Sequence, residues 1–210
     1  MFKLKRNLLA DREELIDDSG KKVEWELLVK MFEYQDVEGL HLANRIKKQH
    51  IYFGRQKMKV KLASQLFSES VADALEVCKE MKLEDFETNE GTIKFIRLLN
   101  DLFDIFNTRY ETCKGFKEPL NKGNFAKVKC RLEEIKKYLK GLKVLATEEE
   151  LPMKKRIKEG LDGYIPLIES KRKVGPVGFS ISIESLIGLF EDVCQADNPL
   201  EENICTNRLC

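Results

Sequence analysis

The chain has 210 residues, with 37 lysines and arginines against 36 aspartates and glutamates, a formal net charge of +1. This balance supplies no long-range field that would recruit nucleic acid or an anionic membrane. No apolar run approaches the ~18 residues needed to span a bilayer, and the first residues lack a secretion signal, so we expect an intracellular protein, nuclear or cytoplasmic.

Helical periodicity dominates the chain and predicts a mainly α fold. Apolar residues recur at three- and four-residue intervals in five expected helices, 23–48, 58–81, 92–107, 124–143 and 183–195. The segment 92–107 is apolar almost all round, which predicts a central, buried helix. Glycines and prolines predict a loop at 107–124 and another at 171–182, before the last expected helix. The sequence contains little strand signal.

Three residues of the expected central helix, Asn100, Phe103 and Asp104, lie within one turn of each other. This set suits a nucleotide base, because an aromatic ring can cover the base and a carboxylate can accept from two neighbouring N–H donors. The alternative is structural: Asn100 bonds a backbone group, Asp104 pairs with a lysine, and Phe103 belongs to the core.

A basic cluster, Lys57, Lys59 and Lys61, alternates with apolar residues before the second expected helix. These ammonium groups could converge on a triphosphate, or they could simply form a solvated helix start. The sequence contains no G-x-x-x-x-G-K-[ST] loop, so a nucleotide would be held by side chains and helix ends.

Cysteine and histidine patterns give no support for a metal site or a nucleophile. The six cysteines form no C-x-x-C pair, and the histidines are His41 and His50. We therefore expect reduced thiols. Neither histidine has a serine or cysteine at a spacing that would indicate a nucleophile paired with a base.

Five pieces of the chain together resemble the transposases of the P-element family, including their THAP-domain-containing vertebrate relatives. They are MFKLKRNLL, EGLHLANRIKKQHIYFGRQKMKVKLASQLFSESVADAL, FIRLLNDLFDIFN, GFKEPL and ICTNRLC. The pieces keep the family's order from the first residue to the last, and the KMKVKLA…SVADAL stretch is long and unusual enough to be specific.

The resemblance implies a helical insertion domain that binds GTP within an RNase H-like catalytic domain carrying a DDE triad. Carried over by position, it implies six GTP contacts in this sequence: Arg45, Lys59, Val60, Asn100, Phe103 and Asp104. Asp104 would read the base edge, because guanine offers N1–H and N2–H side by side whereas adenine has an acceptor at N1. Arg45 stands where the family has a lysine. The arginine keeps the positive charge, but its planar guanidinium differs in shape from an ammonium group.

The same resemblance places the catalytic acids of the family outside this chain. The catalytic aspartate would precede MFKLKRNLL, and the glutamate of a Q-D-x-x-E motif would follow ICTNRLC. An aspartate of that motif that also contacts the nucleotide, and the THAP zinc module, have no counterpart here either. We therefore expect no enzyme activity and no direct DNA-binding module.

The sequence thus predicts a helical GTP-binding insertion domain at 21–196, with RNase H-like remnants at 1–20 and 197–210. GTP, with or without Mg²⁺, would be bound without hydrolysis, and further partners would be transposase-related proteins or a second copy. The rival hypothesis is a helical interaction or regulatory module that no longer binds nucleotide. A third is an incompletely predicted gene for a full transposase.

Overall fold

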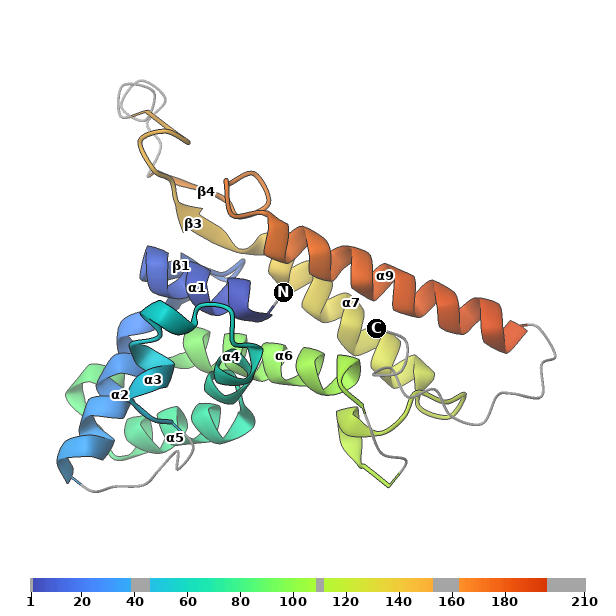
Figure 1. The fold of residues 1–210 in the computed structure, drawn as a ribbon, viewed down its shortest axis with the longest axis horizontal. Coiled ribbons are helices and arrows are strands. Elements are labelled where there is room, and N and C mark those ends of the chain that lie inside the picture. Colours follow the sequence, from blue (N-terminus) through green and yellow to red (C-terminus); the bar gives the residue numbers. More distant parts are fainter. Residues whose placement is uncertain (1, 39–45, 109–111, 153–162, 196–210) are drawn as a thin grey trace.

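The computed structural model describes residues 2–38, 46–108, 112–152 and 163–195, and its fold is mainly α, as predicted (Figure 1). Eight helices are described: α1 Phe2–Arg12, α2 Trp25–Glu38, α3 Lys48–Ile51, α4 Val60–Leu66, α5 Glu69–Glu80, α6 Glu90–Phe106, α7 Phe125–Gly141 and α9 Val174–Gln195. Three 3₁₀ turns connect them: η1 Gly54–Gln56, η2 Glu84–Phe86 and η3 Gly115–Lys117.

Helix α6 occupies the centre of the molecule, which confirms the prediction for segment 92–107. It packs against α5, α7, η3 and strand β2, Lys22–Glu24 (Figure 1). Phe95, Ile96 and Leu102 of α6 are fully buried, and Phe95 makes a T-shaped contact with Phe67 at 5.6 Å. Helix α6 is amphipathic, so its polar residues are collected on the remaining face.

The structure also contains a small antiparallel sheet, not predicted from the sequence, with the strand order β2-β1-β3-β4. Besides β2, its strands are β1 Glu14–Ile16, β3 Lys143–Leu145 and β4 Tyr164–Pro166. Each strand has three residues, too few to show an alternating pattern. Leu15 pairs with Val23 on one side and with Val144 on the other, and the burial of all three residues stabilises the sheet. The β1–β2 hairpin spans the expected boundary between residues 20 and 21, which stays a prediction.

Two predicted helices are divided in the structure. The start of segment 23–48 belongs to β2, and α2 begins at Trp25. Segment 58–81 forms α4 and α5, with a break at Phe67 and Ser68, where the backbone of Ser68 is extended. The apolar stripe runs through both helices, so periodicity could not reveal the break; burial of Phe67 against α6 accompanies it.

Helix α9 begins at Val174, nine residues before the predicted start at 183, and Gly175, Pro176 and Gly178 are helical. Proline is tolerated here because it lies in the first helical turn, where backbone N–H groups have no intrahelical partner. A Cβ on Gly175 would lie 3.6 Å from Cε of Lys5, so α9 packs closely on α1. The prediction of a loop at this point was wrong.

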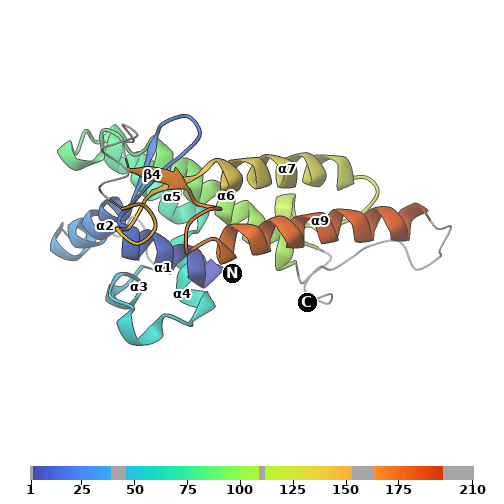
Figure 2. The ribbon, with the colours of Figure 1, turned by 90° about the horizontal axis from the view of Figure 1, so that it is seen from above.

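One face of α9 is buried along α7, and the two helices run side by side in both views (Figure 1; Figure 2). Phe190 stacks on Phe125 of α7 at 4.3 Å, and Lys129 and Lys136 pair with Glu191 and Glu184. By length and hydropathy alone, Val174–Asp192 could cross a membrane, contrary to the sequence expectation. One face of α9 is buried and forms ion pairs with α7, whereas Val177, Ile181 and Leu189 are exposed.

Helix α1 carries two fully buried basic side chains, Lys5 and Arg6. Arg6 lies over the ring of Phe53 at 3.9 Å and donates to the carbonyl oxygen of Lys57 at 3.0 Å. The Nζ of Lys5 has no hydrogen-bond partner among the described residues, and burial lowers the pKa of Lys5 to about 7. A buried ammonium without a partner destabilises the folded state.

Replacing Lys5 with methionine should therefore stabilise the chain most at low and neutral pH. The unfolded chain keeps Lys5 protonated up to a pKa of 10.5, so the cost of burial is full below about pH 7 and fades as the pH rises toward 10.5. We expect a gain on the order of 5 kcal/mol at pH 6, the full cost that the lowered pKa of Lys5 represents. Urea denaturation between pH 6 and 10.5 measures it, with Lys3→Met as the control; a pH-independent gain would contradict this account.

Candidate functional site

A cavity of about 310 Å³ opens beside the C-terminal half of α6. Three of the predicted GTP contacts, Asn100, Phe103 and Asp104, line it together because residues three and four apart share one helix face. The other lining residues come from α4, from the α4–α5 junction and from the chain after α6: Ser64, Gln65, Ser68, Asn107, Thr108, Cys113 and Lys117. The cavity therefore brings together residues from three of the five pieces that carry the resemblance.

The carboxylate of Asp104 is the main charged acceptor of this cavity, with a side chain only 14% exposed. Burial raises the pKa of Asp104, and the nearby Lys117 ammonium opposes that rise. Nζ of Lys117 lies 3.6 Å from Oδ2 of Asp104. Asp101, one turn earlier, instead pairs with Arg131 at 2.6 Å. Asp104 is thus the half-buried carboxylate that faces the cavity.

Asn100 orients this carboxylate. Its Oδ1 accepts from the backbone N–H of Glu69 at 3.3 Å, and its Nδ2 donates to Oδ2 of Asp104 at 3.2 Å. The N-terminus of α5 thereby fixes the amide of Asn100. Within the described part of the chain, Oδ1 of Asp104 accepts no hydrogen bond, so this carboxylate can accept further N–H groups.

Phe103 is half-buried and belongs both to the core and to the cavity wall. Its ring makes a T-shaped contact with Phe2 of α1 at 5.1 Å, and Phe2 contacts Phe179 of α9 in the same way. Contact with Phe2, which is itself held by Phe179, keeps the ring of Phe103 in place. A fixed aromatic ring beside a carboxylate is suited to a flat ligand with N–H donors on its edge.

Two further predicted contacts, Lys59 and Val60, are not among the described residues that line the cavity. Lys59 is exposed and immediately precedes α4, and Val60 is 42% exposed at the first position of α4. Val60 lies one turn before Ser64, on the same side of α4 that reaches the cavity. Arg45 lies outside the described residues. The structure thus brings three of the six residues together and places two more near one end of α4.

Lys117 lines the cavity although no pattern in the sequence predicted it as a site residue. It follows Asp104 by 13 residues, so no helical spacing relates the two. The available signal was GFKEPL, which was used for the resemblance but not for the site. Ser64 and Gln65 were missed for a related reason: their approach to α6 depends on how α4 packs.

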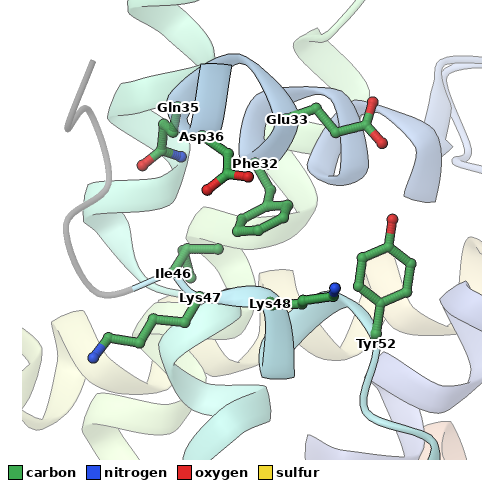
Figure 3. A pocket seen from close by; sticks show the side chains of 8 residues that line it. All are labelled: Phe32, Glu33, Gln35, Asp36, Ile46, Lys47, Lys48 and Tyr52. Atoms are coloured by element: carbon green, nitrogen blue, oxygen red, sulfur yellow. The ribbon is translucent and has the colours of Figure 1, made fainter. Parts of the chain in front are cut away.

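A larger cavity of about 620 Å³ lies between α2 and α3 (Figure 3). Its wall includes the carboxylates of Glu33 and Asp36 as well as Lys47 and Lys48. None of the predicted GTP contacts that the structure describes lines it. Three of the predicted contacts line the cavity beside α6, so we favour that cavity in spite of its smaller volume.

Comparison with known proteins connects this chain with transposases. The family model of the TNP-like GTP-binding insertion domain matches residues 1–119, more than half of the chain. The human DNA transposase THAP9 is 34% identical over 168 residues, which cover 80% of this chain and 17% of that protein. The Drosophila melanogaster transposable element P transposase is 33% identical over 125 residues, 58% of this chain and 16% of that protein.

A solved structure shows the same relationship in three dimensions. The Drosophila P element transposase strand transfer complex matches 99% of this chain with a TM-score of 0.68 and 26% identity. The chain spans about a sixth of the two curated relatives and 41% of the solved chain. The matched sequence, the helical fold and the family model agree: the chain belongs to the TNP-like, GTP-binding insertion domain family of transposases.

Proposed function

We propose that this chain binds GTP in the cavity beside α6, with the base held by Asp104 and Phe103. The observation that carries the proposal is the half-buried carboxylate of Asp104, oriented by Asn100 and open at Oδ1. Membership of a GTP-binding insertion domain family supports the same ligand. In this arrangement the triphosphate extends along α4, and Lys59 at the start of that helix meets its charge.

Guanine is favoured over adenine by the hydrogen-bonding capacity of Asp104. An ionised carboxylate only accepts, and guanine presents two donors, N1–H and N2–H, side by side. Adenine turns an acceptor at N1 toward the same carboxylate. An unpaired buried polar group costs roughly 1–3 kcal/mol, so binding of ATP should be about tenfold weaker or more.

The proposed role is binding without turnover, as a cofactor site in a transposase-derived chain found in the nucleus or cytoplasm. Among the described residues, no group of three or more His, Cys, Asp or Glu side chains is placed to hold a metal ion. Mg²⁺ would therefore enter bound to the triphosphate. Partners in this proposal are transposase-related proteins or a second copy of the chain.

Calorimetry with GTP, guanosine and ATP tests this function on the wild-type chain. We expect saturable binding of GTP, with affinity at least tenfold above that for ATP, and no release of phosphate over hours. Lys59→Ala should lower the affinity for GTP more than the affinity for guanosine, because only GTP carries the phosphate charge. The control is Lys82→Ala, which changes an exposed lysine after α5. Equal binding of ATP and GTP, or no GTP binding at millimolar concentration, would favour the interaction module instead.

A further inference from the structure

Lys117 is held opposite Asp104 by the turn η3. Gly115 opens this turn with a left-handed backbone, φ +66°, a conformation that favours glycine. Phe116 packs against the core, and the N–H of Glu118 closes the turn on the carbonyl oxygen of Gly115 at 3.2 Å. The anchored Phe116 and the closed turn place Lys117 at the cavity wall, with its Nζ 3.6 Å from Oδ2 of Asp104.

We propose that Lys117 and Asp104 together form a donor–acceptor–acceptor edge that reads guanine as cytosine does, with the Lys117 ammonium donating to O6 of the base. Guanine presents the complementary order, an acceptor at O6 followed by donors at N1 and N2. Lys117 would then be a specificity-determining residue that no sequence motif indicated. This inference rests on the proposed GTP binding.

The position of Lys117 relative to the two carboxylate oxygens supports this order. Lys117 approaches Oδ2, whereas Oδ1 accepts no hydrogen bond from the described residues. A base that donates N1–H to Oδ2 and N2–H to Oδ1 has its O6 on the Oδ2 side, next to the ammonium. Adenine would bring its 6-amino donor to this ammonium, so Lys117 adds a second mismatch to the one at N1.

The side chain of Lys117 is also exposed enough to reorient toward a ligand. Its side chain is 61% exposed, so it can move from Oδ2 toward an incoming O6 at little cost. Asn100 also donates to Oδ2, but its Oδ1 is fixed by the N–H of Glu69, which suits it to orienting Asp104. Arg131 and Lys127, two other cations near η3, lie against the ring of Phe116 and do not line the cavity.

The test compares GTP with 6-thio-GTP, in which a weakly accepting sulfur replaces O6. Lys117→Ala should reduce GTP affinity about tenfold, the effect of one charged hydrogen bond, and reduce 6-thio-GTP affinity about threefold or less. Lys114→Ala removes the same charge from an exposed position of the same loop and should change neither affinity by more than about twofold. Thermal denaturation of each variant checks that the chain stays folded.

A second readout is the pH dependence of GTP binding. The ammonium of Lys117 opposes the rise in the pKa of Asp104. In Lys117→Ala the carboxylate should therefore become protonated, and GTP binding should be lost, at a higher pH than in wild type. Asn100→Ala is the companion variant, because it removes the other donor to Oδ2.

The outcomes separate this inference from the function on which it rests. Equal losses of GTP and 6-thio-GTP affinity in Lys117→Ala would overturn the O6 contact while GTP binding stands. A loss of affinity that is larger for GTP than for 6-thio-GTP in Asn100→Ala, and not in Lys117→Ala, would also overturn the O6 contact. A folded wild-type chain without GTP binding would overturn the proposed function itself, and this inference with it.

Discussion

Replacing Asp104 with asparagine should reverse the base preference of the site from guanine to xanthine. The new amide keeps one acceptor and converts the other into a donor. Guanine would then place its N2–H donor against the amide N–H of the asparagine. Xanthine carries a carbonyl at position 2, which would accept a hydrogen bond from that N–H. We expect GTP affinity to fall tenfold or more and xanthosine triphosphate to become the tighter ligand, while Asp104→Ala should lose base preference altogether.

Asp101→Asn provides the matched control, because it makes the same chemical change one turn earlier on α6. Its carboxylate pairs with Arg131 and does not line the cavity. Calorimetric titration of both variants with GTP, xanthosine triphosphate and ATP gives the comparison. If Asp104→Asn and Asp101→Asn bound all three nucleotides alike, Asp104 would not be the residue that reads the base.

Replacing Gly91 with alanine should destabilise the fold, although alanine is normally the better helix former. Gly91 is buried in the first turn of α6, against the backbone of β2. An added Cβ would overlap the carbonyl oxygen of Lys22 and lie 2.9 Å from its carbonyl carbon, so either α6 or the strand must move. Thr92 fixes the same contact by accepting from the N–H of Glu24 at 3.0 Å. We expect a loss of about 1–3 kcal/mol or more in the free energy of unfolding.

Gly188→Ala provides a control of opposite sign. Gly188 lies inside α9, and an added Cβ would meet nothing within 4 Å. Without a clash, helix propensity dominates, so this variant should gain roughly 0.5–1 kcal/mol. Urea denaturation of the two variants and wild type, followed by circular dichroism, measures both. If Gly91→Ala were as stable as Gly188→Ala, α6 and β2 would not pack as closely as described.

The long helices and half of the site could be predicted because they depend on local spacing. Helices α6 and α7 carry an uninterrupted apolar stripe over 17 residues each, and such a stripe is buried in almost any packing. Asn100, Phe103 and Asp104 share a helix face for the same geometric reason, so their shared cavity wall follows from α6 alone. The resemblance to P-element transposases added the expected ligand.

Other features were decided only by the tertiary structure, because they depend on contacts between residues distant in the sequence. The three-residue strands form because Leu15 is buried between Val23 and Val144. Helix α9 extends through a proline and two glycines because its first turns pack on α1. Lys117 reaches Asp104 through the turn that Gly115 opens. Local propensity sets which segments can be helical, but burial and close packing determine where elements end and which side chains meet.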